Sequence, residues 1–106
     1  MPRSATSAAV FAALGDETRL RMVARLCRQG PMSIARLTDG FAITRQAITK
    51  HLRVMKAAGI VRGSRKGREN VWQLEQQRLV DARRHLQAIS MQWDETLGRL
   101  KRFVER

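Results

Sequence analysis

The sequence predicts a mainly helical fold with one small β-hairpin, in the order α-α-α-α-β-β-α. Apolar residues recur at helical spacing in four short segments before residue 59, and each segment is bounded by a capping residue or a glycine. Two short apolar runs then flank a charged segment that contains glycine, as in a hairpin. Beyond residue 75 the chain has no proline and one glycine, which predicts a single long helix. With 106 residues, the chain fits one domain covering 1–106.

The charge balance of the chain narrows the classes of function. The formal net charge is +12, from 21 Lys and Arg against 9 Asp and Glu, and 43% of the residues are hydrophobic. The chain is therefore apolar enough to fold, and its charge favours a polyanion such as nucleic acid, or an anionic membrane surface. Between residues 45 and 68 there are eight cations and no acid. No phosphate loop, nucleophile elbow or apolar carboxylate pair is present, so we expect neither an enzyme nor a bound cofactor.

Cysteine usage and hydropathy predict the compartment. Cys27 is the only cysteine, so an intramolecular disulfide is impossible and a reducing compartment is expected. No stretch approaches the roughly 20 apolar residues that span a bilayer, so we expect a cytoplasmic protein without membrane contact. Cys27 itself is expected to be buried on the apolar face of its helix.

The first two helices are predicted from apolar spacing and from their ends. The first is expected at 7–14, and Gly15 ends it. Asp16 suits the N-cap of the second, which ends at Gly30 and the proline that follows. The apolar residues expected on the buried sides of these helices are Val10, Phe11, Leu14, Leu20, Val23, Leu26 and Cys27.

Two further short helices are predicted between residues 33 and 58. Ser33 can cap a third helix that ends near Gly40, and Thr44 can cap a fourth that ends at Gly59. Because only a few residues join them, the region 33–58 is expected to form a helix-turn-helix.

The fourth helix has one apolar and one acid-free polar face. At about 100° per residue, Ile48, Leu52 and Met55 form a stripe that we expect to be buried, with His51 at its edge. The side chains on the other side and at the N-terminal tip can hydrogen-bond to base edges or neutralise phosphates, which indicates contact with double-stranded DNA. These candidate DNA-contacting residues are Thr44, Arg45, Gln46, Thr49, Lys50 and Arg53, with Ala57 allowing close approach of a groove wall.

The segment 60–74 is predicted to be a basic hairpin. The runs Ile60-Val61 and Val71–Leu74 suit two strands, and RGSRKGREN between them is too charged to bury. Four cations lie near its two glycines: Arg62, Arg65, Lys66 and Arg68. Such a tip can enter a minor groove, where the negative potential attracts cations. Trp72 is expected to pack in the core and not to serve as a platform for stacked bases.

The last helix, expected at 75–104, carries a heptad seam. A helix of about 28 residues is about 40 Å long, whereas a compact domain of this size is only about 30 to 35 Å across. The helix must therefore lie along something beyond its own domain, and a second copy fits the heptad spacing. The seam residues are Leu79, Ala82, Leu86, Ile89, Trp93, Thr96, Leu100 and Phe103, widened by Leu97 and Val104.

The segments FAALGDETRLRMVARL and ITKHLRVMKAAGIV, followed by a basic hairpin and a long helix, resemble the ArsR family of winged-helix repressors. The resemblance covers about Val10 to Val104. It implies a winged helix-turn-helix, a symmetric homodimer built from the first and last helices (Val10 and Phe11 included), and a palindromic operator that an inducer releases. By the same resemblance Thr44, Arg45, Gln46, Thr49 and Lys50 read the major groove, and Arg65 and Arg68 form the wing.

The chain departs from the metal-sensing members of that family. Those members carry a Cys-x-Cys pair at the start of the third helix, or Asp and His ligands along the last one. Here the third helix reads SIARLTDG, and Asp81 and His85 do not match the family spacing. We therefore expect no metal site and an unknown inducer. A metal-responsive repressor, or a winged-helix module that binds protein or RNA, remain the alternatives.

Overall fold

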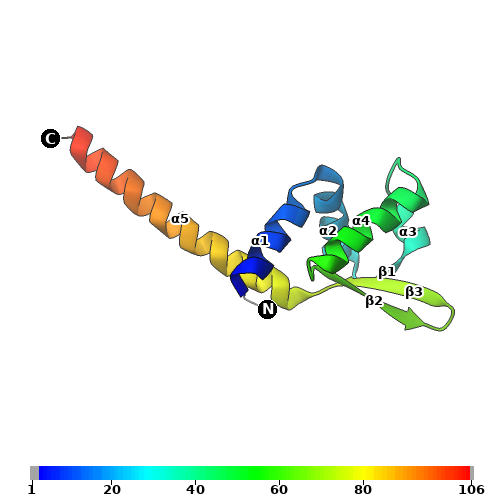
Figure 1. Ribbon diagram of the computed structural model, residues 1–106. Coiled ribbons are helices and arrows are strands. Elements are labelled where there is room, and N and C mark those ends of the chain that lie inside the picture. The colour runs from blue at the N-terminus through cyan, green and yellow to red at the C-terminus, as the bar shows by residue number, and fades with distance from the viewer. Residues whose placement is uncertain (1–2, 106) are drawn as a thin grey trace.

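The computed structural model describes the backbone of residues 3–105 and the side chains of residues 7–105. Four short helices and a three-stranded sheet form a compact body, from which one long helix extends (Figure 1). This is the predicted mainly helical fold, so the fold class is confirmed. The elements are α1 (Arg3–Leu14), α2 (Glu17–Gln29), β1 (Met32–Ser33), α3 (Ile34–Thr38), α4 (Arg45–Ala57), β2 (Val61–Lys66), β3 (Glu69–Leu74) and α5 (Gln76–Val104).

Three helices begin at the predicted capping residues. The side chain of Asp16 accepts a hydrogen bond from the backbone N–H of Arg19 at 2.9 Å, which holds the pKa of this carboxyl below its usual value. Ser33 caps α3 and Thr44 caps α4 in the same way, at 3.2 and 3.1 Å. Each cap satisfies a backbone N–H that the first turn of a helix leaves unpaired.

The strands differ from the expectation in number and length. β1 was not predicted, because two residues are too few to show an alternating pattern; it pairs with β3 through Met32 and Trp72. β2 and β3 reach further toward the turn than their apolar runs do, so Arg65 and Lys66 lie on a strand and Gly67 alone has a positive φ in the turn. A solvent-exposed ribbon keeps its backbone paired whatever its side chains are, so apolar patterning underestimates its length. α1 also begins earlier than predicted, at Arg3.

The core lies where the helix-turn-helix meets the sheet. The predicted stripe on α4 is fully buried, together with residues from α2, α3 and the sheet. The largest fully buried side chains are Met22, Met32, Leu37, Ile48, Leu52, Met55, Ile60, Val10 and Val61. Trp72 is half-buried and packs against this core, as expected.

Two sequence predictions of burial, those for Cys27 and Leu20, are wrong. Cys27 is exposed and Leu20 is 51% exposed, because the buried side of α2 is formed by Met22 and Leu26, four residues apart. Cys27 is about 100° around the helix from Leu26, and Leu20 is about 200° from Met22. Val10 is 1% exposed within the protomer, which leaves its side chain almost no surface for the predicted contact with a partner subunit.

The long helix α5 packs on the body only at its root. Ala82 is buried and Leu79 packs against the core, while the rest of the helix projects away (Figure 1). The molecule accordingly measures 67 × 33 × 20 Å. Within the part of the chain that the structure describes, no helix is both long enough and apolar enough to cross a bilayer.

Arg25 joins α2 to the end of α3. Its guanidinium donates hydrogen bonds to the carbonyl oxygens of Leu37 at 2.6 Å and Arg36 at 2.9 Å. These carbonyls lie at the C-terminal end of α3, where intrahelical N–H donors run out; the carbonyl oxygen of Leu37 also accepts from Gly40 N at 3.4 Å. A cation at this end of a helix interacts favourably with the helix dipole. The guanidinium of Arg25 lies against the backbone of Gly40. A side chain at this position would collide with it, because a Cβ on Gly40 would lie 2.9 Å from Arg25 Cζ. Arg25 therefore sets the position of α3 within the helix-turn-helix.

Replacing Arg25 by Met should lower the free energy of unfolding by about 1–2 kcal/mol, because two carbonyls lose a charged donor while the apolar stem remains. Urea denaturation measures the change. The matched control is Arg28→Met on the exposed side of α2, which we expect to change stability by less than about 0.5 kcal/mol. Equal losses in the two variants would contradict the role of Arg25.

Candidate nucleic-acid interface

The burial of one side of α4 determines which of its side chains face solvent. Ile48, Leu52 and Met55 have no exposed surface, so the opposite side of the helix faces solvent. The structure places Gln46, Lys50 and Arg53 on this exposed side, as the helical spacing predicts, and Ala57 is exposed beyond them. This exposed side of α4 carries no acidic residue.

The two threonines of α4 use their hydroxyl groups within the helix. Thr44 Oγ1 accepts from Ala47 N in the N-cap, and Thr49 Oγ1 donates to the carbonyl oxygen of Arg45 at 2.9 Å. Thr49 is also half-buried. The hydrogen-bonding groups that α4 offers freely are therefore the longer side chains of Arg45, Gln46, Lys50 and Arg53, while the threonines contribute chiefly their methyl groups.

Arg19, on α2, connects α1 to α4. Its Nε donates to the carbonyl oxygen of Ala13 at 2.5 Å, and its Nη1 lies 3.4 Å from Nδ1 of His51. His51 is half-buried at the edge of the α4 stripe, as predicted. The LGDETRLR segment thus joins α1 to α4. Sequence spacing alone does not reveal this link.

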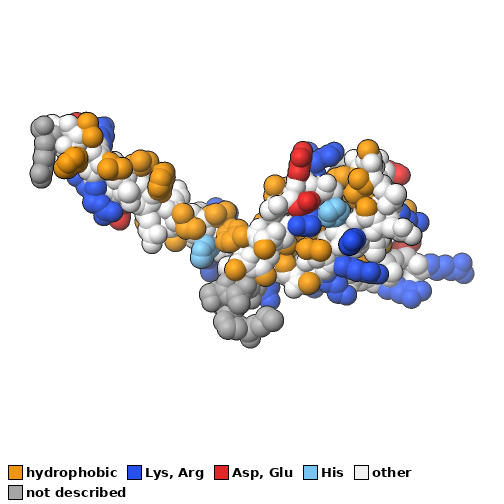
Figure 2. All heavy atoms as spheres, turned by 45° about the horizontal axis from the view of Figure 1, so that its top comes forward, with side chains coloured by type: hydrophobic (Ala, Val, Ile, Leu, Met, Phe, Trp, Pro, Cys, Tyr) orange, Lys and Arg blue, Asp and Glu red, His pale blue; other side chains and the backbone are white. Residues whose placement is uncertain are grey.

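The hairpin of β2 and β3, the wing, carries the second group of cations. Its register pairs Arg65 with Asn70 and Lys66 with Glu69. Arg65 Nε donates to the carbonyl oxygen of Gly67 at 3.4 Å, so this guanidinium lies beside the turn. Lys66 and Arg68 are exposed next to it. Lys and Arg side chains gather around this end of the molecule in Figure 2.

Arg62 differs from the other wing cations. Its Nε lies 2.9 Å from a carboxylate oxygen of Glu75, and Glu75 N donates to the carbonyl oxygen of Ile60 at 2.7 Å. This pair joins the base of the wing to the first turn of α5. Arg62 is therefore engaged within the protomer, and Glu75 is a structural residue that the sequence interpretation did not single out, because its partner lies on a neighbouring strand.

The apolar seam of α5 is exposed along most of its length. Trp93 is 62% exposed and Leu100 is 56% exposed, and Figure 2 shows apolar side chains following one side of the helix. The seam begins beyond the root: Leu79 is half-buried in its own domain, and the ring of Phe11 packs beside His85 with centroids 5.6 Å apart. The exposed seam residues are Leu86, Ile89, Trp93, Leu97, Leu100, Phe103 and Val104.

The candidate metal ligands of the sequence do not come together in one protomer. Over the described side chains, no group of three or more His, Cys, Asp or Glu residues is placed to hold an ion. Asp81 accepts a hydrogen bond from Gln77 at 3.1 Å, and His85 packs against Phe11.

These elements define a winged helix-turn-helix DNA-binding protein, and comparisons with known proteins identify its family. A helix-turn-helix domain model matches residues 14–64. The HTH-type transcriptional regulator YuzN of Bacillus subtilis is 41% identical over 69 residues, covering 59% of this chain and 75% of YuzN. The solved ArsR-like transcriptional regulator from Rhodococcus sp. RHA1 superimposes with a TM-score of 0.78 at 36% identity, covering 95% of this chain and 94% of the other.

The chain therefore belongs to the ArsR family of helix-turn-helix transcriptional regulators, which bind DNA. These relatives are regulators and not enzymes, as the composition predicted. A more distant match is the homodimeric winged helix-turn-helix DNA-binding domain of Mb0332 from Mycobacterium bovis. It has a TM-score of 0.65 at 21% identity and covers 89% of this chain and 83% of its own, so it supports the fold alone.

Proposed function

We propose that this regulator is a homodimeric, sequence-specific repressor that binds an inverted-repeat operator. The observation that carries the proposal is the presence of two exposed surfaces on one protomer: the acid-free side of α4 and the apolar seam of α5. The first matches the polar edges of a DNA groove, and the second matches a copy of itself.

Leaving the apolar seam of α5 in water is unfavourable, and this favours dimerisation. Burying a large apolar side chain contributes about 1.5–3 kcal/mol, and the seam exposes several along one side of α5. Continuous apolar surfaces of this kind on soluble proteins mark interaction sites. The Mb0332 domain, which has the same fold, is itself homodimeric. In our proposal Leu86, Ile89, Trp93, Leu97 and Leu100 form the centre of the interface, with Leu79 and Phe11 at its edge and without the buried Val10.

Base reading is assigned to α4 and phosphate contact to the wing. Gln46 can pair with adenine in bidentate fashion, and Lys50 and Arg53 can pair with guanine. Arg45 and the N-terminal turn capped by Thr44 suit a phosphate, while the methyl of Thr49 suits a thymine methyl. Arg65, Lys66 and Arg68 neutralise phosphates or enter the minor groove.

A symmetric dimer requires a symmetric operator. Two α4 helices in successive major grooves are separated by one turn of DNA, about 34 Å, so the half-sites form an inverted repeat. Repression is the mode that the resemblance to ArsR-family repressors implies. We also propose that this member lacks the metal sites of its family, because α3 carries no thiolate or imidazole and Cys27 is the only thiol in the chain.

Replacing Trp93 by Asp should yield a folded monomer with much weaker operator binding, because a charge then lies at the centre of the seam. Sedimentation measures the oligomeric state and a duplex titration measures affinity. The matched control is Met91→Asp, since Met91 is 69% exposed and lies about 160° around α5 from Trp93. A dimer that persists in Trp93→Asp would contradict the proposed interface.

Replacing Gln46 by Ala should cost about 1–3 kcal/mol of binding free energy on the operator and little on random duplex, because a base contact is lost.

Replacing Arg68 by Ala should instead weaken binding to both duplexes equally and flatten the salt dependence of binding by about one phosphate. Arg102→Ala, at the far end of α5, removes the same charge and should leave both affinities unchanged. Identical behaviour of the Gln46 and Arg68 variants on the two duplexes would rule out this division of roles.

A further inference from the structure

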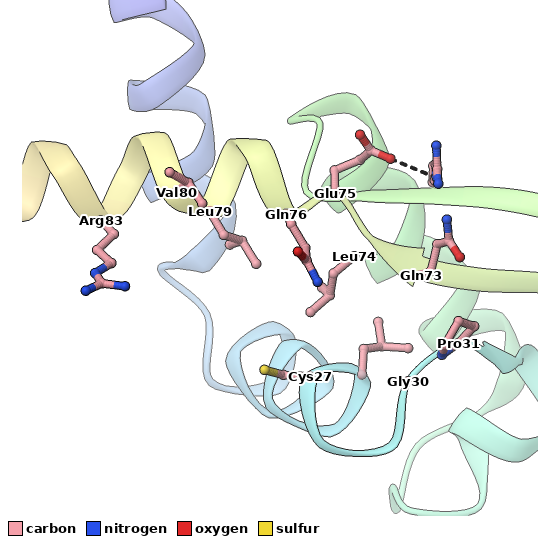
Figure 3. A pocket seen from close by; sticks show the side chains of 12 residues that line it. Cys27, Gly30, Pro31, Gln73, Leu74, Glu75, Gln76, Leu79, Val80 and Arg83 are labelled. Carbon is pink, nitrogen blue, oxygen red and sulfur yellow. Dashed lines mark ion pairs between the residues drawn. The ribbon is translucent and has the colours of Figure 1, made fainter.

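A pocket of about 690 Å³ lies between the end of α2, the base of the wing and the start of α5. Pockets of this size hold small organic molecules. Figure 3 shows Leu79 and Arg83 extending from α5 on the side that faces α2, with Cys27 on the opposite wall. Leu79 and Arg83 are four residues apart, so the helical repeat places them on one side of α5.

The lining combines an apolar wall with a free cation. Leu26, Leu74, Leu79 and Val80 supply the apolar surface. The guanidinium of Arg83 forms no ion pair with any side chain in the described range, whereas Arg62, also in the lining, is paired with Glu75. An unpaired guanidinium beside an apolar wall is complementary to a carboxylate attached to a hydrocarbon chain or ring.

We propose that this pocket binds a small amphipathic carboxylate, held by Arg83 at its charged end and by the leucine-rich wall along its body. The ligand is the effector of the regulator and weakens its binding to DNA. The effector role rests on the proposed function, whereas binding in the pocket does not.

A ligand in this pocket acts on the DNA-contacting elements through the residues that form the rim and the floor of the pocket. Its rim includes Arg62 and Glu75, whose ion pair joins the wing to α5, and Gln73 and Leu74 of the wing strand β3. Its floor includes Leu26 of α2, which packs in the core with α4. A molecule lodged between α2 and α5 shifts the wing and α4 relative to the dimer helix, and the two recognition helices then lose their spacing.

Cys27 supplies a direct test, because it is exposed, lines the pocket and is the only cysteine of the chain. The full-length protein is alkylated with iodoacetamide, a neutral reagent, while octanoate is added as the probe. At about ten times its dissociation constant, octanoate should slow alkylation about tenfold, because only the free fraction reacts. Octanol, which has the same chain without the charge, should protect far less.

The variant Arg83→Gln should raise the dissociation constant of octanoate about tenfold, the loss expected for one charge-assisted contact, so that the same octanoate concentration slows alkylation only about twofold. The matched control Arg84→Gln removes the neighbouring cation, which does not line the pocket, and should protect like the wild type. Equal protection by octanol, equal protection in Arg83→Gln, or failure of iodoacetamide to reach Cys27 in the free protein would each overturn the site.

The effector role is then measured by operator binding in the same octanoate concentrations. Octanoate should weaken operator binding by wild type and Arg84→Gln, and leave Arg83→Gln unaffected at the concentration that halves wild-type binding. Protection of Cys27 without any change in operator affinity would overturn the effector role. A wild-type protein that binds no operator without octanoate would contradict the proposed function, and the alkylation results would still decide the pocket.

Discussion

The burial of Ile48, Leu52 and Met55 is the constraint on which the rest of the structure depends. These three side chains occupy one stripe of α4 and have no exposed surface, so the helix cannot rotate without bringing polar groups into the core. The orientation of Gln46 and Lys50 toward solvent follows from this burial. The orientation of the polar face is therefore fixed by the apolar packing behind it, and this reduces the entropy lost in the contact with a DNA groove that we propose.

The second determinant is the length of α5. A short domain can cover only the root of a 29-residue helix, around Leu79 and Ala82, and the remaining seam is left exposed. The Arg62–Glu75 pair ties this helix to the wing, and Arg19 ties α1 to α4. The elements that we propose to contact DNA are thus joined to the seam by direct contacts, through which a bound ligand could act in our proposal.

Features set by local chemistry could be predicted from the sequence, and features set by distant packing could not. The caps at Asp16 and Thr44 involve a side chain and its own backbone three residues on, so residue type alone predicts them. The polar face of α4 follows equally from helical spacing. The exposure of Cys27 and the pairing of Arg62 with Glu75 depend on which elements meet in space. The assignment of α4 and the wing to DNA contact remains a proposal.

The central claim is that two copies joined through α5 hold their α4 helices at the pitch of DNA. It is tested most directly by a pulsed spin-label distance measurement on Lys50→Cys in a Cys27→Ser background, where the label occupies the only thiol. The account predicts a separation of about 34 Å in the protein free of DNA. Absence of any dipolar coupling, or a separation far from one turn of the duplex, would contradict it.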